Sequence, residues 1–162
     1  MMVHAFRTAG LTLVLAFWPS HPSYLEPSVD VEPHIKGGQS VSLEGRWSIF
    51  RMGESPTRSK CLALHRSQVR AILFAEGLQV EYVGRGPVIA YSLEVDDRSL
   101  GQPQSPWVDP WTIRLRPSEF RRVVGAKRLR IDAATHVGRI RDDLDLTGIQ
   151  AAVAVLASER CN

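Results

Sequence analysis

A stretch near the middle of the chain alternates strictly between apolar and polar residues, and this alternation constrains the fold more than any other feature. In the segment 77–83 (GLQVEYV), Leu78, Val80 and Tyr82 fall on one side of an extended chain, and polar residues fall on the other. A period of two is typical of a β-strand with one buried face. The segment predicts a half-buried strand, and Gly84 and Pro87 after it supply turn chemistry.

Similar short segments recur along the chain, separated by polar or glycine-containing turns. They cover residues 46–52, 60–66, 69–75, 88–97, 126–133 and 137–146. Among their apolar residues, we expect Trp47, Ile49, Ile89, Tyr91, Leu93 and Val95 to face the core. Several short strands at this spacing favour a mainly β fold, an antiparallel β-sandwich-like domain.

Two short helices are predicted in the second half of the chain. The first covers 116–125 (RPSEFRRVVG), with Ser118 as its N-cap, Phe120, Val123 and Val124 at helical spacing and Gly125 as its stop. The second is C-terminal. It begins at a capping box formed by Thr147 and Gln150, and its apolar stripe is Ile149, Ala152, Val153 and Leu156.

The N-terminal segment has the layout of a secretory signal. Arg7 precedes an apolar run from about Ala9 to Trp18, and a polar stretch with prolines follows. The run is too short for a membrane-spanning helix, which needs about 20 apolar residues. We therefore predict a signal peptide over 1–23, a flexible linker over 24–44 and a single β-rich domain over 45–162. An uncleaved N-terminal anchor is the alternative.

The chain has two cysteines, Cys61 and Cys161. An exported chain would meet an oxidising compartment, in which they could pair. Such a bridge would tie the end of the C-terminal helix to an early strand. The alternative is two unrelated thiols.

These features together resemble the invasion-associated locus B family. The resemblance covers residues 45–161 and rests on Trp47 early in a strand, a cysteine about a dozen residues later, the strand and turn at 88–97, the helix around Phe120 and the closing segment 144–156 (LDLTGIQAAVAVL). In that closing segment the matching residues are Leu146, Gly148, Ala151, Ala152 and Leu156. The chain departs from the family in having no cysteine directly after the tryptophan strand and none in mid-chain. The resemblance implies an exported proteobacterial protein of mostly β architecture, linked to the cell envelope, without enzymatic activity.

No catalytic or cofactor motif stands out. The histidines lack metal-site spacing, and the segment from Gly84 onward lacks the third glycine of a phosphate loop. We predict no enzyme, no metal and no cofactor. The alternative is a small periplasmic hydrolase with a scattered site, in which Ser92, His65 and His136 would converge with aspartates.

A basic cluster in the second half is the most suggestive candidate for binding. Its members are Arg114, Arg116, Arg121, Arg122, Lys127, Arg128 and Arg130. If Trp111, Ile113 and Leu115 face the core, Arg114 and Arg116 share the opposite face. The cluster could bind anionic lipid, lipopolysaccharide or an acidic envelope protein; a merely solvated face is the alternative. Nucleic acid is disfavoured, since the net charge is only +3 and no aromatic row interleaves the arginines. The predicted function is binding in the periplasm or outside the cell, with a structural role in an envelope assembly as a further alternative.

Overall fold

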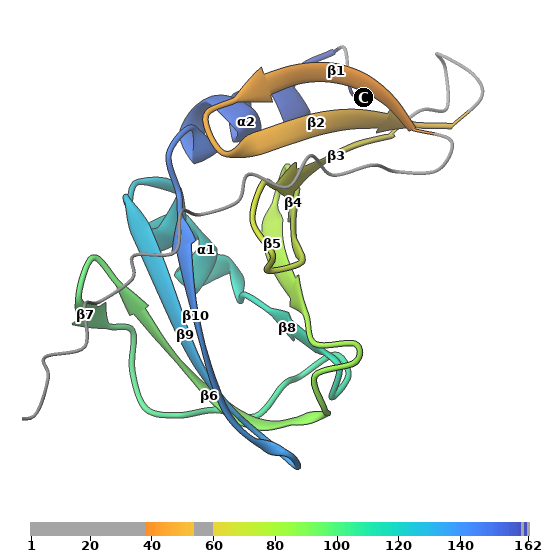
Figure 1. The fold of residues 1–162 in the computed structure, drawn as a ribbon. Coiled ribbons are helices and arrows are strands. Elements are labelled where there is room, and N and C mark those ends of the chain that lie inside the picture. The colour runs from red at the N-terminus through yellow and green to blue at the C-terminus, as the bar shows by residue number, and fades with distance from the viewer. Residues whose placement is uncertain (1–37, 54–59, 160, 162) are drawn as a thin grey trace, which may run out of the picture.

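A computed structural model describes residues 38–53, 60–159 and 161, and within this part the chain forms two antiparallel sheets and two helices (Figure 1). The predicted signal peptide and the first part of the predicted linker lie outside the described residues. One sheet has six strands in the order β1-β2-β3-β4-β5-β8, and the other has four in the order β10-β9-β6-β7. The first sheet comprises β1 (Gly38–Glu44), β2 (Trp47–Met52), β3 (Lys60–His65), β4 (Ala71–Phe74), β5 (Gly77–Glu81) and β8 (Thr112–Arg114). The second comprises β6 (Val88–Val95), β7 (Arg98–Ser99), β9 (Arg128–Thr135) and β10 (Gly138–Asp145), and the helices are α1 (Pro117–Val124) and α2 (Ile149–Leu156). The prediction of a mainly β, antiparallel fold with a mid-chain and a C-terminal helix is confirmed.

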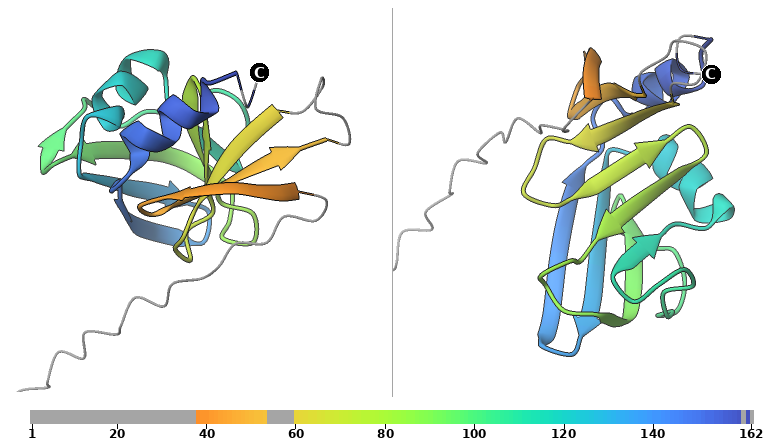
Figure 2. Two further views of the ribbon diagram at one scale, coloured as in Figure 1. Left: turned by 90° about the horizontal axis from the view of Figure 1, so that it is seen from above. Right: turned by 90° about the vertical axis from the view of Figure 1, so that its right-hand side faces the viewer.

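The six-stranded sheet twists strongly between its two edges. In Figure 1, β1 and β2 cross the top of the molecule, whereas β5 and β8 descend beside the four-stranded sheet. Helix α2 packs against β1, β2, β3 and β4, and α1 contacts β5 and α2. The left-hand view of Figure 2 shows both helices on the same side of the molecule.

The core lies between the two sheets and is built by the predicted alternation. Trp47, Leu78 and Tyr82 from the six-stranded sheet are fully buried, as are Leu129 and Ile131 from the four-stranded sheet. Their neighbours in sequence point to solvent, because successive side chains on a strand alternate between faces.

On β6, a residue that was predicted to face the core is exposed. Ile89 has half of its surface in contact with solvent, whereas Val88 beside it is buried. The pairing of β6 with β9 shifts register between Val88 and Ala90, so a β-bulge at Ile89 reverses the alternation there. Tyr91, further along β6, faces inward as predicted.

The predicted linker ends earlier than residue 44. Residues 38–44 form β1, which pairs antiparallel with β2. The strand is at the edge of its sheet and none of its residues is fully buried, so no sustained apolar alternation marked it in the sequence. The domain therefore includes Gly38–Glu44.

Both predicted N-caps are wrong, whereas the predicted stop of the first helix at Gly125 is confirmed. Arg116 is the N-cap of α1, and its backbone N–H donates to the Glu119 carboxylate at 2.7 Å, so Ser118 lies inside the first turn. Gly148 is the N-cap of α2, with φ of 85°. The Thr147 hydroxyl donates to Asp145 Oδ1 at 2.6 Å, and this local bond replaces the expected capping box with Gln150.

The junction between β10 and α2 packs backbone against backbone on the β1–β2 turn. The Arg46 N–H donates to the Thr147 carbonyl at 2.9 Å. A Cβ at Gly148 would lie 2.2 Å from the Glu44 carbonyl oxygen, and one at Gly45 would lie 2.3 Å from the Thr147 carbonyl oxygen. Only glycine permits this approach, so the two glycines fix where the C-terminal helix docks.

Candidate functional site

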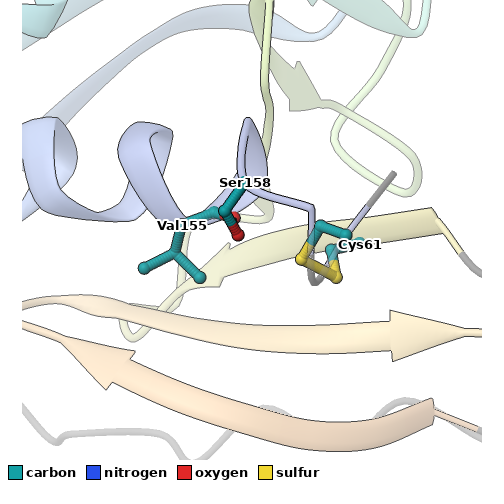
Figure 3. The surroundings of a disulfide bond; sticks show 4 residues. Cys61, Val155 and Ser158 are labelled. Carbon is teal, nitrogen blue, oxygen red and sulfur yellow. A yellow bond between two sulfur atoms is a disulfide. The ribbon is translucent and has the colours of Figure 1, made fainter.

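A disulfide joins Cys61 on β3 to Cys161 after α2 (Figure 3). The two residues are 100 apart in sequence, and their Cα atoms are 5.1 Å apart. The chain between α2 and Cys161 is tightened by two bonds: the Ser158 hydroxyl donates to the Val155 carbonyl at 2.6 Å, and the Cys161 N–H donates to the Ser158 carbonyl at 2.9 Å. The bridge therefore holds the chain end against the six-stranded sheet.

The residues of the predicted basic cluster lie on three elements of the fold. Arg114 lies on β8 and Arg116 caps α1; Arg121 and Arg122 lie within α1, and Lys127 precedes β9. All five side chains are exposed, and within the described part of the chain none of them forms an ion pair.

The remaining two members of the cluster are engaged by carboxylates on the outer face of the four-stranded sheet. Arg130 bonds Glu94 at 3.0 Å and Asp143 at 3.1 Å, and both contacts raise its pKa, that with Asp143 the more. Arg128 forms an ion pair with Asp97. This face alternates positive and negative charge, so Arg128 and Arg130 contribute little free positive potential.

Arg114 lies over an exposed aromatic ring. Its guanidinium carbon is 6.0 Å from the centroid of Trp107, whose indole N–H donates to the Arg114 carbonyl at 2.7 Å. Ile113 and Leu115 are buried as predicted, but Trp111 is 43% exposed. The reason is that Trp111 lies in a turn, where its N–H is held by Asp109, and strand alternation starts only at Thr112.

The three residues of the alternative hydrolase site do not converge. His65 is at the end of β3, with Nδ1 2.7 Å from the Ser67 hydroxyl and Nε2 2.8 Å from the Asp145 carbonyl. His136 is in the turn between β9 and β10, at the opposite end of that hairpin from Asp145. Ser92 lies on β6 beside Asp132, where no histidine is among its neighbours across the sheet.

His65 is a structural histidine. Because a carbonyl only accepts hydrogen bonds, Nε2 must carry a proton, and Nδ1 of the neutral ring then accepts from Ser67. Burial lowers the pKa of His65, against the opposing influence of Asp145. The ring also packs edge-on against Trp47 with centroids 4.9 Å apart, so it ties β3 to the end of β10.

A buried ionic group that the sequence did not indicate lies in the middle of β10. Asp142, only 5% exposed, accepts two hydrogen bonds from the Arg85 guanidinium, at 2.7 and 2.9 Å, and one from the Tyr82 hydroxyl at 2.9 Å. Burial, and then the Asp142 charge, raise the pKa of Tyr82, and the bond to Asp142 raises the pKa of Arg85. The negative charge of Asp142 is compensated by the positive charge of Arg85, so the group is a structural crosslink between the two sheets and not a ligand site.

Surface hollows in the described part of the chain are shallow. One of about 210 Å³ on the outer face of the four-stranded sheet is lined by Ser92, Asp132 and Arg139, among others. A broader one, of about 500 Å³, lies where the loops before β9 and α2 meet and includes Lys127. The first hollow brings Ser92 and Asp132 together, but Asp132 is paired with Arg141 at 2.7 Å, and no histidine is among the residues that line either hollow.

No group of three metal-ligating side chains comes together in residues 38–53, 60–159 and 161. Within the same ranges, neither helix has the length and hydropathy that crossing a bilayer requires.

Fold and site thus define a mainly β protein of two antiparallel sheets, closed by one long-range disulfide. No family model matches the chain, and no curated protein matches it. Its structure is similar to the crystal structure of invasion associated protein B from Bartonella henselae. The two chains are 14% identical, the match covers 71% of this chain and 94% of that one, and the TM-score is 0.48.

Proposed function

We propose that this chain is an exported protein of the cell envelope, distantly related to the invasion-associated locus B family, that acts by binding. The observation that carries the proposal is the disulfide between Cys61 and Cys161. Disulfides that close a domain persist in oxidising compartments and are rare in the reducing cytoplasm. The apolar N-terminal segment, outside the described residues, supplies the export signal.

The binding role is supported by what the surface offers. Exposed basic side chains that form no ion pair with another described residue continue from β8 along α1 to Lys127, whereas the serine and histidines of the hydrolase alternative lie apart. The proposed ligand is an anionic surface of the envelope, such as lipid or lipopolysaccharide phosphate, contacted by Arg114, Arg116, Arg121, Arg122 and Lys127. Arg128 and Arg130 support these contacts less, because their charges are paired.

Cell fractionation of the native host tests the proposal. We expect the protein in the periplasmic or envelope fraction, with an intact mass that lacks the leader and two hydrogens. A cytoplasmic protein of full mass with two free thiols would refute it. A protein that leaves the cell but co-purifies with a stoichiometric envelope complex would instead favour the structural accessory role.

A further inference from the structure

Exposed large apolar side chains gather at one end of the molecule. Within the described residues every large hydrophobic side chain that is exposed, except Leu43, belongs to or adjoins three loops at this end. The loops are the β5–β6 segment, the segment before β8 and the β9–β10 turn, and they lie together at the lower end in Figure 1 and in the right-hand view of Figure 2. The six side chains, here called the loop-end patch, are Val83, Ile89, Trp107, Val108, Trp111 and Val137.

The three loops are fixed to one another by backbone hydrogen bonds. Tyr82 N–H donates to the Trp111 carbonyl at 2.7 Å, and Val88 N–H donates to the Pro110 carbonyl at 2.6 Å. The third loop joins through His136 N–H, which donates to the Pro87 carbonyl at 3.3 Å. The patch is therefore a preformed platform, and its apolar side chains are held in water rather than turned inward.

Among the charged side chains around the loop-end patch, those that form no ion pair with another described residue are mostly positive. Arg114 and Arg139 are exposed and form no ion pair within the described part of the chain. The Asp142 carboxylate is neutralised by Arg85. The remaining carboxylate of these loops is that of Asp109, and one of its oxygens accepts a hydrogen bond from the Trp111 N–H. Two free cations thus flank the apolar side chains.

The shape of the loop-end patch favours a lipid surface over a peptide as its ligand. The patch side chains project from loops, and the hollows described above are lined by other residues. Tryptophan and aliphatic residues on a projecting surface, with arginines behind them, suit the boundary between acyl chains and anionic headgroups. A peptide would need a groove to bury its side chains.

We propose that the loop-end patch docks on an anionic lipid bilayer, with its apolar side chains at the acyl boundary and with Arg114 and Arg139 among the headgroup phosphates. The inference rests on the proposed function, since it names the partner of an exported binding protein. It shares Arg114 with the contacts proposed there and places the main contact at the loop-end patch instead of α1.

Vesicle co-sedimentation of the purified mature, disulfide-bonded chain tests this. The probes are vesicles of phosphatidylethanolamine with phosphatidylglycerol, and phosphatidylcholine vesicles as the neutral comparison. The main variant is Val83→Asp with Val137→Asp, at the two most exposed positions of the patch, 68% and 77%. Leu43→Asp is the matched control, because Leu43 is 55% exposed on β1, at the opposite end of the molecule.

We expect wild type to bind anionic vesicles, and the double variant to lose about tenfold or more in partitioning, since two apolar contacts are replaced by charges that the headgroups repel. Leu43→Asp should bind within about twofold of wild type. Far-ultraviolet circular dichroism and an intact disulfide establish that each variant is folded.

Three results would overturn the inference: no binding by wild type, full binding by the folded double variant, or equal losses in the double variant and Leu43→Asp. A third variant, Arg121→Glu with Arg122→Glu, locates the contact. If this variant alone loses binding, the lipid contact is at α1, and the loop-end patch is not the docking surface. Failure in vesicles leaves the export proposal standing, because fractionation and thiol state test that separately.

Discussion

Substitution of Gly148 by alanine tests the docking of the C-terminal helix. Gly148 combines a left-handed backbone, φ of +85°, with a 2.2 Å approach of its would-be Cβ to the Glu44 carbonyl oxygen. Gly84 has nearly the same φ, +81°, but nothing lies within 4 Å of its would-be Cβ. The pair therefore separates backbone strain from steric contact.

The expected magnitudes follow from these two contributions. Alanine in the left-handed region costs about 1 to 2 kcal/mol at either position. At Gly148 the backbone of the β1–β2 turn must also move, which adds about 1 to 3 kcal/mol of the kind seen in overpacked cores. The gain from restricting the unfolded chain, about 0.4 to 1 kcal/mol, is common to both variants and cancels in the comparison.

Urea unfolding followed by tryptophan fluorescence and circular dichroism measures the difference. We expect Gly148→Ala to be less stable than Gly84→Ala by about 1 to 3 kcal/mol, and Gly45→Ala to behave like Gly148→Ala. Equal midpoints for Gly148→Ala and Gly84→Ala, with equal slopes, would refute the reasoning that backbone contact fixes the helix.

Three further predictions concern the disulfide, the buried ionic group and the buried histidine. Replacing both Cys61 and Cys161 by alanine should lower the unfolding free energy by about 4 to 5 kcal/mol, which corresponds to the entropy of closing a loop of about 100 residues. A reductant should lower the stability of wild type by the same amount and leave the variant unchanged. A loss below about 1 kcal/mol would contradict this prediction. Asp142→Asn leaves Arg85 partly buried without a counter-charge and should lower the free energy of unfolding in urea by about 2 to 3 kcal/mol. The control variant Asp132→Asn breaks a surface pair with Arg141 and should lower it by under about 1 kcal/mol. Similar losses in the two variants would show that the buried group is not a crosslink. Burial lowers the pKa of His65 from its ordinary 6.5. The unfolded chain therefore takes up its proton first as pH falls, so the stability from the neutral ring is complete above about pH 6.5 and is lost as pH falls through the folded-state pKa. Unfolding measured from about pH 7.5 to about pH 5 should show this loss in wild type, and an equal slope in His65→Gln would exclude it.

The sequence predicted those parts of the fold in which buried and exposed residues alternate regularly. The half-buried strand at Leu78, Val80 and Tyr82 and the stripe of α2 both arise from a periodic burial pattern, which a sequence displays directly. The edge strand β1 was missed because none of its residues is fully buried, so its sequence shows no sustained apolar alternation. The prediction that Ile89 faces the core was wrong because a bulge inserts one residue into β6. The insertion moves the side chains before it to the opposite face of the strand.

The site was less predictable, because its features depend on contacts between distant segments. Asp142 reads as part of an acidic run beside Asp143, yet one carboxylate is buried on Arg85 and the other pairs with Arg130 at the surface. The basic cluster was divided in the same way, since the acidic partners of Arg128 and Arg130 come from β6, the turn after it and β10. The segment 105–111 (SPWVDPW) did carry a signal: two tryptophans among prolines, outside any alternating pattern, indicate aromatic residues on a loop.

We propose that the chain leaves the cytoplasm and is closed by one disulfide between β3 and its C-terminal end. Thiol trapping in living cells of the native host distinguishes the two states of the cysteines: an alkylating reagent is added before lysis, and the mass of the chain is then measured with and without prior reduction. We expect neither Cys61 nor Cys161 to be labelled until the protein is reduced, and both to be labelled afterwards. Two labelled cysteines in the unreduced sample would contradict it.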